Sequence, residues 1–455
     1  MTTVHIGCGA GFAGDRFDAA VPVVAALANA KGERFLIYEV LAERTLAIAQ
    51  RLRHGNADQG YSPFLDTYLP LVLADCHRHG IRIVTNMGAA NPLGAARRVH
   101  VLAHALGIRG LKVVAVTGDD LLASMSEAEI RCEPVMEGIG LGEHSIVAAN
   151  AYLGAQPVAD ALATGAHVVL VGRTTDAALS LGPLMHVHGW KTDALDLLAQ
   201  GTVCGHLLEC GAQVSGAYFP DPGFKDVPDL DRVGFPIAEV DADGTLIITK
   251  PPGTGGLLSR ATVIEQLFYE VHDPHNYLTP DVILDLGEVQ VEETGANRVR
   301  VHGARGKPPP VTLKATICVE GGWLGEGEIS YAGPNALARA ELAATVVRAR
   351  CRAIGIGDRV RVEVLGTEAI FDGNGGARRS RISPNPDGEY RMRAAVRSAA
   401  RKTAQQVSDE VLSLYCSGPA GGAGVRQQVS PQFSTASILI DRARVQARIS
   451  VVEGT

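Results

Sequence analysis

The sequence has few aromatic residues and no excess of positive charge. Aromatic residues make up 5% of its 455 residues, and Asp and Glu outnumber Lys and Arg by 49 to 42, which gives a formal net charge of -7. A chain without a basic field offers no general attraction to phosphodiester backbones or to anionic lipid. We therefore expect neither nucleic acid nor a membrane surface as a partner.

Long hydrophobic runs and clustered cysteines are also missing. No apolar stretch approaches the length that spans a bilayer, and the start of the chain runs into a strand-like segment without a signal-peptide pattern. The eight cysteines are scattered through the chain, unlike the disulfide framework of a small secreted protein. These absences predict a soluble, cytoplasmic protein with reduced thiols.

The N-terminal part alternates short apolar runs with longer amphipathic segments, which is typical of βαβ units. This pattern predicts an α/β fold with a doubly wound, mostly parallel sheet in a first domain over residues 1–200. The expected strands cover residues 4–6, 35–40, 81–85, 113–116 and 167–171, and the expected helices cover 19–30, 44–54, 65–79, 95–106 and 158–164.

Beyond residue 200 the pattern changes to hairpin-like pairs, so we expect a smaller α+β domain over residues 201–455. Residues 237–240 and 245–249 form the clearest hairpin. Further strands are expected at 282–286, 298–301, 311–319, 359–365 and within 436–452, and helices at 262–271, 336–353 and 391–414.

Polar residues follow the strands of the first domain, at the edge where ligands bind in open parallel sheets. Asp15, Asp119 and Asp176 are candidates for proton transfer, and Arg173 for holding developing negative charge. The same residue types also serve as helix caps and turn residues, which is the alternative for each position taken singly. The candidate substrate-binding residues along this edge are Gly9, Gly11, Arg16, Tyr61, Asn86 and Asn91.

The order Gly9-x-Gly11-x-x-Gly14 also permits a dinucleotide site, with Glu39 binding the ribose hydroxyls. Glu39 lies farther along the chain than the usual spacing of about 20 residues. Asp15 and Arg16 also crowd the place where a pyrophosphate would approach. A nicotinamide-dependent oxidoreductase is therefore the alternative enzyme class.

A second cluster, Cys204-Gly205-His206-Leu207-Leu208-Glu209-Cys210, concentrates two thiols, an imidazole and a carboxylate. Its spacing matches no common zinc site, so no metal is expected. His206 with Glu209 is the candidate base with its orienting group, ahead of Cys210 as a nucleophile. Burial in a core is the alternative for all of them.

The segment Lys250-Pro251-Pro252-Gly253-Thr254-Gly255-Gly256 precedes a helix. Lys250, Gly253, Gly255 and Gly256 suit a phosphate cradle of the kind that holds a coenzyme A pyrophosphate, and a simple turn is the alternative. Coenzyme A as part of the substrate is thus the one cofactor-like group expected.

Taken together, these segments resemble the acyclic terpene utilisation A (AtuA) family. The resemblance rests on residues 6–11, 61–64, 85–92, 172–176, 205–211, 234–239, 249–256, 265–270, 273–274 and 279–282. It implies catabolism of acyl-CoA or branched carboxylic acids. Longer members of the family continue into a small C-terminal module, so the resemblance also implies a separate small subunit in its place. A homo-oligomer is a further expectation for this chain.

The leading hypothesis is a lyase or hydratase that acts on an acyl-CoA or a hydroxy carboxylic acid by acid-base chemistry. The oxidoreductase remains the second hypothesis. A third is a non-catalytic subunit that binds acyl-CoA within a larger complex.

Overall fold

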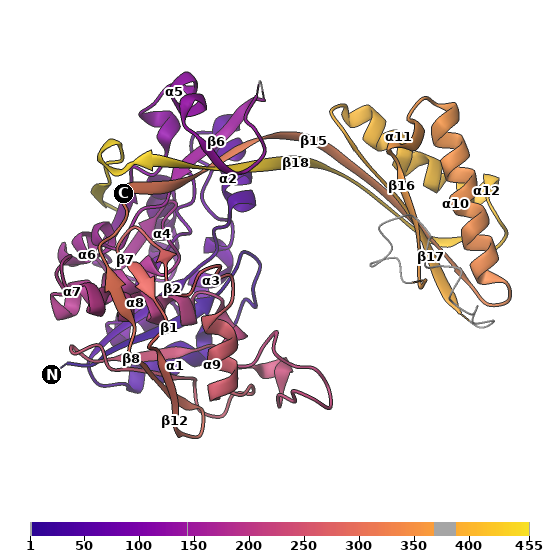
Figure 1. Ribbon diagram of the computed structural model, residues 1–455. Helices are drawn as coiled ribbons and strands as arrows, with labels where there is room; N and C mark the ends of the chain where they lie inside the picture. Colours follow the sequence, from indigo (N-terminus) through magenta and orange to yellow (C-terminus); the bar gives the residue numbers. More distant parts are fainter. Residues whose placement is uncertain (1, 143, 368–387, 455) are drawn as a thin grey trace. The chain divides into compact units, whose positions relative to one another are not determined.

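A computed structural model describes residues 2–142, 144–367 and 388–454 (Figure 1). The chain forms two compact units, the first of residues 1–318 and 435–455 and the second of residues 319–434. It enters the second unit within β15 (Thr312–Ala332) and leaves it within β18 (Ala423–Asp441). The expected division at residue 200 does not coincide with these units, because residue 200 lies inside helix α8 (Leu195–Leu208) of the first unit.

The first unit is built on a ten-stranded sheet in the order β12-β13-β9-β8-β1-β2-β3-β7-β4-β19. Its central strands β1, β2, β3, β7 and β4 are parallel, and the strands on both sides of them are antiparallel. The α/β class is therefore confirmed in a mixed form, because the antiparallel hairpin β8/β9 pairs with β1 and extends the same sheet. The strands are β1 (Val4–Ala10), β2 (Glu33–Tyr38), β3 (Arg82–Thr85), β4 (Val113–Thr117), β7 (Val168–Val171), β8 (Ile237–Val240), β9 (Leu246–Thr249), β12 (Gln290–Gly295), β13 (Arg298–His302) and β19 (Arg448–Val452).

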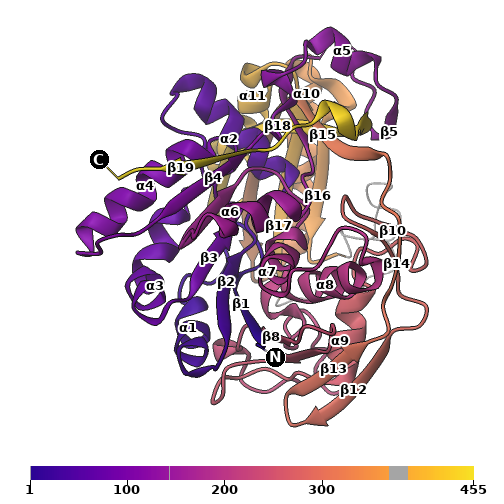
Figure 2. The ribbon, with the colours of Figure 1, turned by 90° about the vertical axis from the view of Figure 1, so that its left-hand side faces the viewer.

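Helices cover the parallel strands, whose β-branched side chains are buried. Helix α1 packs on α3 and α3 on α4, while α6 packs on α7 and α7 on α8 (Figure 2). None of the described helices is long and apolar enough to cross a membrane. These helices are α1 (Ala20–Asn29), α3 (Leu65–His79), α4 (Pro92–Ala105), α6 (Gln156–Ala163), α7 (Ala178–His188) and α8.

Further helices and strands complete the first unit. A three-stranded sheet has the order β10-β11-β14, β5 pairs with β18, and β6 pairs with β15. The elements are α2 (Glu43–Gly55), α5 (Glu127–Cys132), β5 (Val135–Gly138), β6 (Ile146–Ala151), α9 (Arg260–Leu267), β10 (Tyr277–Leu278), β11 (Ile283–Asp285) and β14 (Arg305–Lys307).

The second unit has the order β15-α10-β16-β17-α11-β18, with the short helix α12 (Leu414–Ser417) before its last strand. Its strands lie in the order β16-β17-β15-β18, as in a ferredoxin-like split βαβ unit. The helix expected over residues 391–414 is wrong in its first part, because residues 389–398 form β17. There Tyr390, Met392 and Val396 alternate with exposed or half-buried residues, the two-residue period of a strand. The elements are α10 (Ala336–Ala353), β16 (Arg361–Leu365), β17 (Glu389–Ser398) and α11 (Arg401–Leu412).

Candidate functional site

The glycine loop after β1 packs against protein. A Cβ atom at Gly9 would lie 2.5 Å from the ring of Tyr38, and one at Gly11 would lie 2.4 Å from the backbone of Cys210. The Asp15 carboxylate accepts hydrogen bonds from the backbone N–H groups of Gly11, at 2.9 Å, and Arg16, at 2.7 Å. The glycines thus permit close packing, and Asp15 fastens the loop. The chain after α8 occupies the space beside Gly11 and the Tyr38 ring that beside Gly9, where a dinucleotide pyrophosphate would approach.

Other candidates along the edge are also engaged in holding loops. The Arg16 guanidinium donates to the Leu230 carbonyl at 3.2 Å, and Tyr61 is half-buried against the core. Asn91 caps α4 by accepting from the N–H of Gly94 at 3.0 Å, and its amide donates to the carbonyls of residues 57 and 59. These contacts favour the structural alternative for Asn91.

Glu39 and Asn86 form a buried pair at the ends of β2 and β3. The Asn86 amide donates to Glu39 Oε1 at 2.8 Å, and the Leu41 N–H donates to the same oxygen at 2.9 Å. Asn86 Oδ1 accepts from the N–H of Val40 at 2.8 Å. Burial raises the pKa of Glu39, although the nearby Arg173 opposes this. Oε1 of Glu39 is therefore already engaged in hydrogen bonds with Leu41 and Asn86.

Asp119, after β4, supports the loop that carries Arg173. Its Oδ2 accepts from the Asn150 amide and from the backbone N–H of Arg173, both at 2.8 Å. A Cβ atom at Gly172 would lie 2.4 Å from Asp119 Oδ1, so the loop rests directly on this carboxyl group. Burial raises the pKa of Asp119 to about 6. Asp119 acts on the site through the loop it holds.

The raised pKa of Asp119 predicts a specific pH dependence. Because its folded-state pKa lies above the usual 3.8, the protonated form stabilises the fold, and this contribution is lost as the pH rises from about 4 to about 6. Asp119→Asn removes the titration. Urea unfolding should show the stability difference between wild type and variant changing by about 3 kcal/mol over this range. The exposed Asp18→Asn is the control, and a constant difference for Asp119→Asn would contradict the prediction.

Arg173 is the centre of the polar cluster. Its guanidinium pairs with Asp176 at 2.9 Å, donates to the carbonyl of Leu41, and approaches Glu43 at 3.9 Å. Its Cζ atom lies 4.1 Å from the centre of the Tyr152 ring, and the Tyr152 hydroxyl donates to Glu43. The Arg173 side chain is only 5% exposed, whereas those of Asp176 and Glu43 are 33% and 36% exposed. Arg173 therefore positions two carboxyl groups that solvent reaches.

The two carboxyl groups beside Arg173 have opposite pKa shifts. Burial and the charges of Glu39, Glu209 and Glu43 raise the pKa of Asp176, although Arg173 opposes them. Burial also opposes ionisation of Glu43, but Arg173 and the Tyr152 hydroxyl lower its pKa overall. Environments that separate the pKa values of neighbouring acids are a mark of acid-base sites.

His206 and Glu209 lie at the end of α8 as a second pair. His206 Nδ1 is 3.0 Å from Glu209 Oε1, and the hydrogen bond and charge of Glu209 raise the pKa of His206 against the effect of burial. Tyr277 of β10 lies beside them, with 5.8 Å between its ring centre and that of His206. Burial and the Glu209 charge raise the pKa of the Cys210 thiol, which disfavours the expected alternative of a nucleophilic cysteine.

Gly205 brings α8 to the loop after β7. A Cβ atom at Gly205 would lie 2.5 Å from the Cα of Ala177, next to Asp176. The charge of Glu209 also contributes to the raised pKa values of Asp176, Glu39 and Tyr277, which places these groups in one electrostatic neighbourhood. The structure thus joins the two clusters that the sequence left separate.

This close approach predicts the effect of Gly205→Ala. Alanine favours helix by about 1 kcal/mol over glycine, but the methyl group would collide with the backbone of Ala177. We expect a net loss of about 1–3 kcal/mol in the free energy of unfolding, as for other overpacked sites. Gly55→Ala is a matched control in α2, where a Cβ atom meets nothing within 4 Å. Equal stability changes in the two variants, measured by urea unfolding, would refute this account.

The Lys250 segment takes no part in this cluster. Lys250 Nζ donates to the Thr254 carbonyl at 2.7 Å. Cβ atoms at Gly255 and Gly256 would collide with the carbonyls of Asp229 and Ser215, so those two glycines permit chain packing. Of the four residues of the expected phosphate cradle, only Lys250 and Gly253 line a pocket, and this pocket is separate from the cluster.

Sequence reasoning missed Glu43, Tyr152 and Tyr277. Glu43 begins α2 and looks like an ordinary first-turn acid, and Tyr152 follows β6, a strand that the sequence pattern did not reveal. Tyr277 lay just beyond residues 273–274 of the family resemblance, which was its only signal. Within the described residues, no group of three or more His, Cys, Asp or Glu side chains is arranged to hold a metal ion.

The fold and the cluster define an α/β protein with interacting acids at the carboxyl edge of its parallel strands. The family model for acyclic terpene utilisation family protein AtuA matches residues 4–451. The chain belongs to this family, which relates it to acyclic terpene catabolism and confirms the resemblance. Comparisons with curated proteins and with solved structures gave no match.

Proposed function

We propose that the chain is a hydro-lyase or hydratase that acts on a hydroxylated or α,β-unsaturated acyl thioester, of which acyl-CoA is the expected form. The observation that carries the proposal is Asp176, an acid with a raised pKa held at 2.9 Å by the Arg173 guanidinium, while Glu43, with a lowered pKa, supplies the nearby negative charge. The adjacent His206 and Glu209 add a second acid-base pair.

In the dehydration direction, Glu209 takes the proton from the carbon next to the thioester carbonyl. Its orientation is fixed by the hydrogen bond with His206 Nδ1. The electron pair of that C–H bond forms the C=C bond. The C–O bond at the neighbouring carbon breaks, and the departing hydroxyl takes the proton of Asp176 to leave as water. Arg173 then stabilises the Asp176 carboxylate.

The charge of the cluster favours a thioester over a free acid. The carboxylates of Glu43 and Glu209 lie in a cluster with the acids Glu39 and Asp176, so a substrate carboxylate close to the reacting carbons would be repelled. A thioester carbonyl carries no net charge and avoids this repulsion. The C–H bond next to a thioester carbonyl is also more acidic than the one next to a free carboxylate.

Proton exchange tests this proposal without knowledge of the natural substrate. The protein is incubated in D2O with a panel of enoyl- and 3-hydroxyacyl-CoA thioesters and the matching free acids. NMR should show deuterium entering the α position of thioesters, together with interconversion of the two forms. No exchange with any compound would refute the proposal. A titration that follows NADH fluorescence tests the oxidoreductase alternative, and clear micromolar binding would favour it.

A further inference from the structure

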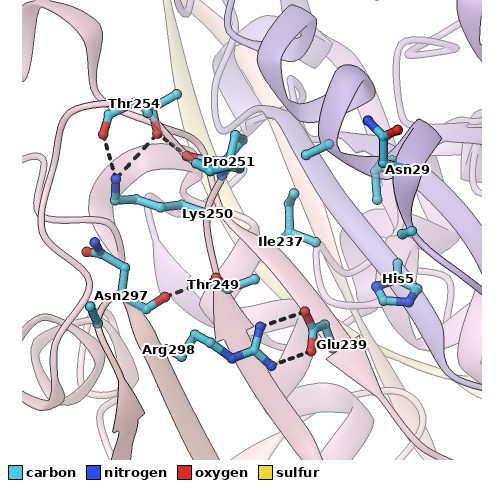
Figure 3. A pocket seen from close by; sticks show the side chains of 16 residues that line it. His5, Asn29, Ile237, Glu239, Thr249, Lys250, Pro251, Thr254, Asn297 and Arg298 are labelled. Atoms are coloured by element: carbon cyan, nitrogen blue, oxygen red, sulfur yellow. Dashed lines mark hydrogen bonds and ion pairs between the residues drawn. The ribbon is translucent and has the colours of Figure 1, made fainter.

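A pocket of about 550 Å³ lies apart from the acid cluster (Figure 3). It is bounded by the last turn of α1, by β8 and β9, and by the turn at residues 250–254. His5 lines the pocket near the amino end of β1, at a position opposite Glu239 in the antiparallel pairing of β1 with β8. The acid cluster instead follows the carboxyl ends of β2 and β7. The pocket is therefore a separate site, of a size typical for small-molecule ligands.

Lys250 carries a charge in this pocket without an acidic partner. The residue is only 8% exposed, and its Nζ donates to the Thr254 carbonyl at 2.7 Å and more weakly to Thr254 Oγ1 at 3.4 Å. It forms no ion pair with any described residue. An ammonium group has three donors, and a buried charge is costly unless it is paired. Burial accordingly lowers the pKa of Lys250.

The other charges that line the pocket are already neutralised. Arg298 and Glu239 form a two-pronged ion pair, with bonds of 2.9 and 2.7 Å, visible in Figure 3. His5 Nε2 lies 2.9 Å from the Lys31 carbonyl. The pocket therefore has one uncompensated positive group, at the Lys250 end.

Apolar groups form much of the remaining wall. Ala26 and Leu27 of α1, Ala30 just after it, Ile237 and Pro251 line the pocket. Gly253 has a left-handed φ of 77°, and no atom lies within 4 Å of the place where its Cβ would be. The walls thus suit a ligand with an apolar body and one anionic group.

We propose that this pocket binds an organic anion, a phosphate or carboxylate on a partly apolar body, whose charged group contacts Lys250. The inference goes beyond the proposed lyase reaction and does not depend on it, because it rests on residues outside the acid cluster. The ligand anion supplies the partner that Lys250 lacks.

Calorimetric titration with two probes tests the site on the full chain. Adenosine 5′-monophosphate represents an organic phosphate, and octanoate represents a carboxylate with an apolar tail. Lys250→Met should weaken binding of the active probe about tenfold to a hundredfold, since a hydrogen bond to a charged group is lost. Lys250→Arg should retain most of the affinity. Ala26→Phe should block binding by filling the pocket, with Lys250 unchanged.

Lys191→Met, at an exposed position outside the pocket, is the matched control and should bind as the wild type does. Binding of only one probe would identify phosphate or carboxylate as the recognised group. Absence of binding by both probes would overturn the inference. Binding that survives both Lys250→Met and Ala26→Phe would also overturn it, because the probe would then lie elsewhere. Thermal unfolding of each variant shows whether it is folded.

Discussion

Asp176→Asn is expected to lower kcat by about two to four orders of magnitude, the usual contribution of a positioned proton donor. Asparagine has the shape of a protonated carboxyl group and keeps an oxygen that accepts from Arg173, but it cannot deliver a proton to a leaving hydroxyl. The loss should fall on kcat and leave substrate affinity nearly unchanged. The readout is turnover of whichever thioester shows α-proton exchange.

Measuring the stability of Asp176→Asn shows whether a loss of activity comes from catalysis or from misfolding. Because the pKa of Asp176 is raised in the folded protein, its ionisation opposes folding, and the neutral asparagine should leave the protein at least as stable as the wild type. The exposed Asp160→Asn serves as the control and should retain full activity. Full activity of Asp176→Asn would remove Asp176 from the mechanism. It would also favour the hypothesis of a non-catalytic acyl-CoA-binding subunit.

Arg173→Met is expected to lower the free energy of unfolding by about 1.5–3 kcal/mol, because the hydrogen bonds of a charged group to Leu41 and Asp176 are lost. The guanidinium is 5% exposed and is shared by Asp176, Glu43, the Leu41 carbonyl and the Tyr152 ring. Methionine fills part of the space but leaves the Glu43 carboxylate without its cation. Urea unfolding near neutral pH measures the loss.

The pH dependence of this loss identifies its cause. Arg173 lowers the pKa of Glu43, so its contribution is present above the usual pKa of a glutamate and is lost as the pH falls through the lowered value. The difference between wild type and Arg173→Met should therefore shrink in acid. Arg78→Met, which removes an exposed pair with Asp75, should cost at most about 1 kcal/mol. A similarly small loss for Arg173→Met would contradict the proposed role of this arginine.

The two-residue and 3.6-residue periods of the sequence predicted most elements that carry the site. The expected strands at 35–40 and 167–171 overlap β2 and β7, and the expected helix at 65–79 matches α3 in both bounds. The expected helix at 391–414 was wrong at its start, because local helix propensity outweighed the alternating pattern in the prediction. Sheet pairing decides that competition in the folded chain.

Some candidate residues hold loops or cap helices in the structure, and others lie in the acid cluster. Asp15 and Asn91 were reasonable as chemical groups, yet loop N–H groups and helix caps engage them, and the sequence shows no sign of which use prevails. Arg173 and Asp176 share one loop, so their proximity was predictable. Glu43 and Tyr152 reach the same guanidinium from other parts of the chain, and only folding brings them there.

The sequence alone determined the α/β class, the polar edge after the parallel strands and the family, because these depend on local pattern and on the order of motifs. The tertiary structure alone decided that α8 lies against the loop after β7, through Gly205 and Ala177, and that Asp176 and Glu209 therefore influence each other's surroundings. It also decided that Lys250 belongs to a different pocket. The reason is physical: burial and the charge of distant residues set a side chain's pKa and partners, and neither is encoded by spacing along the chain.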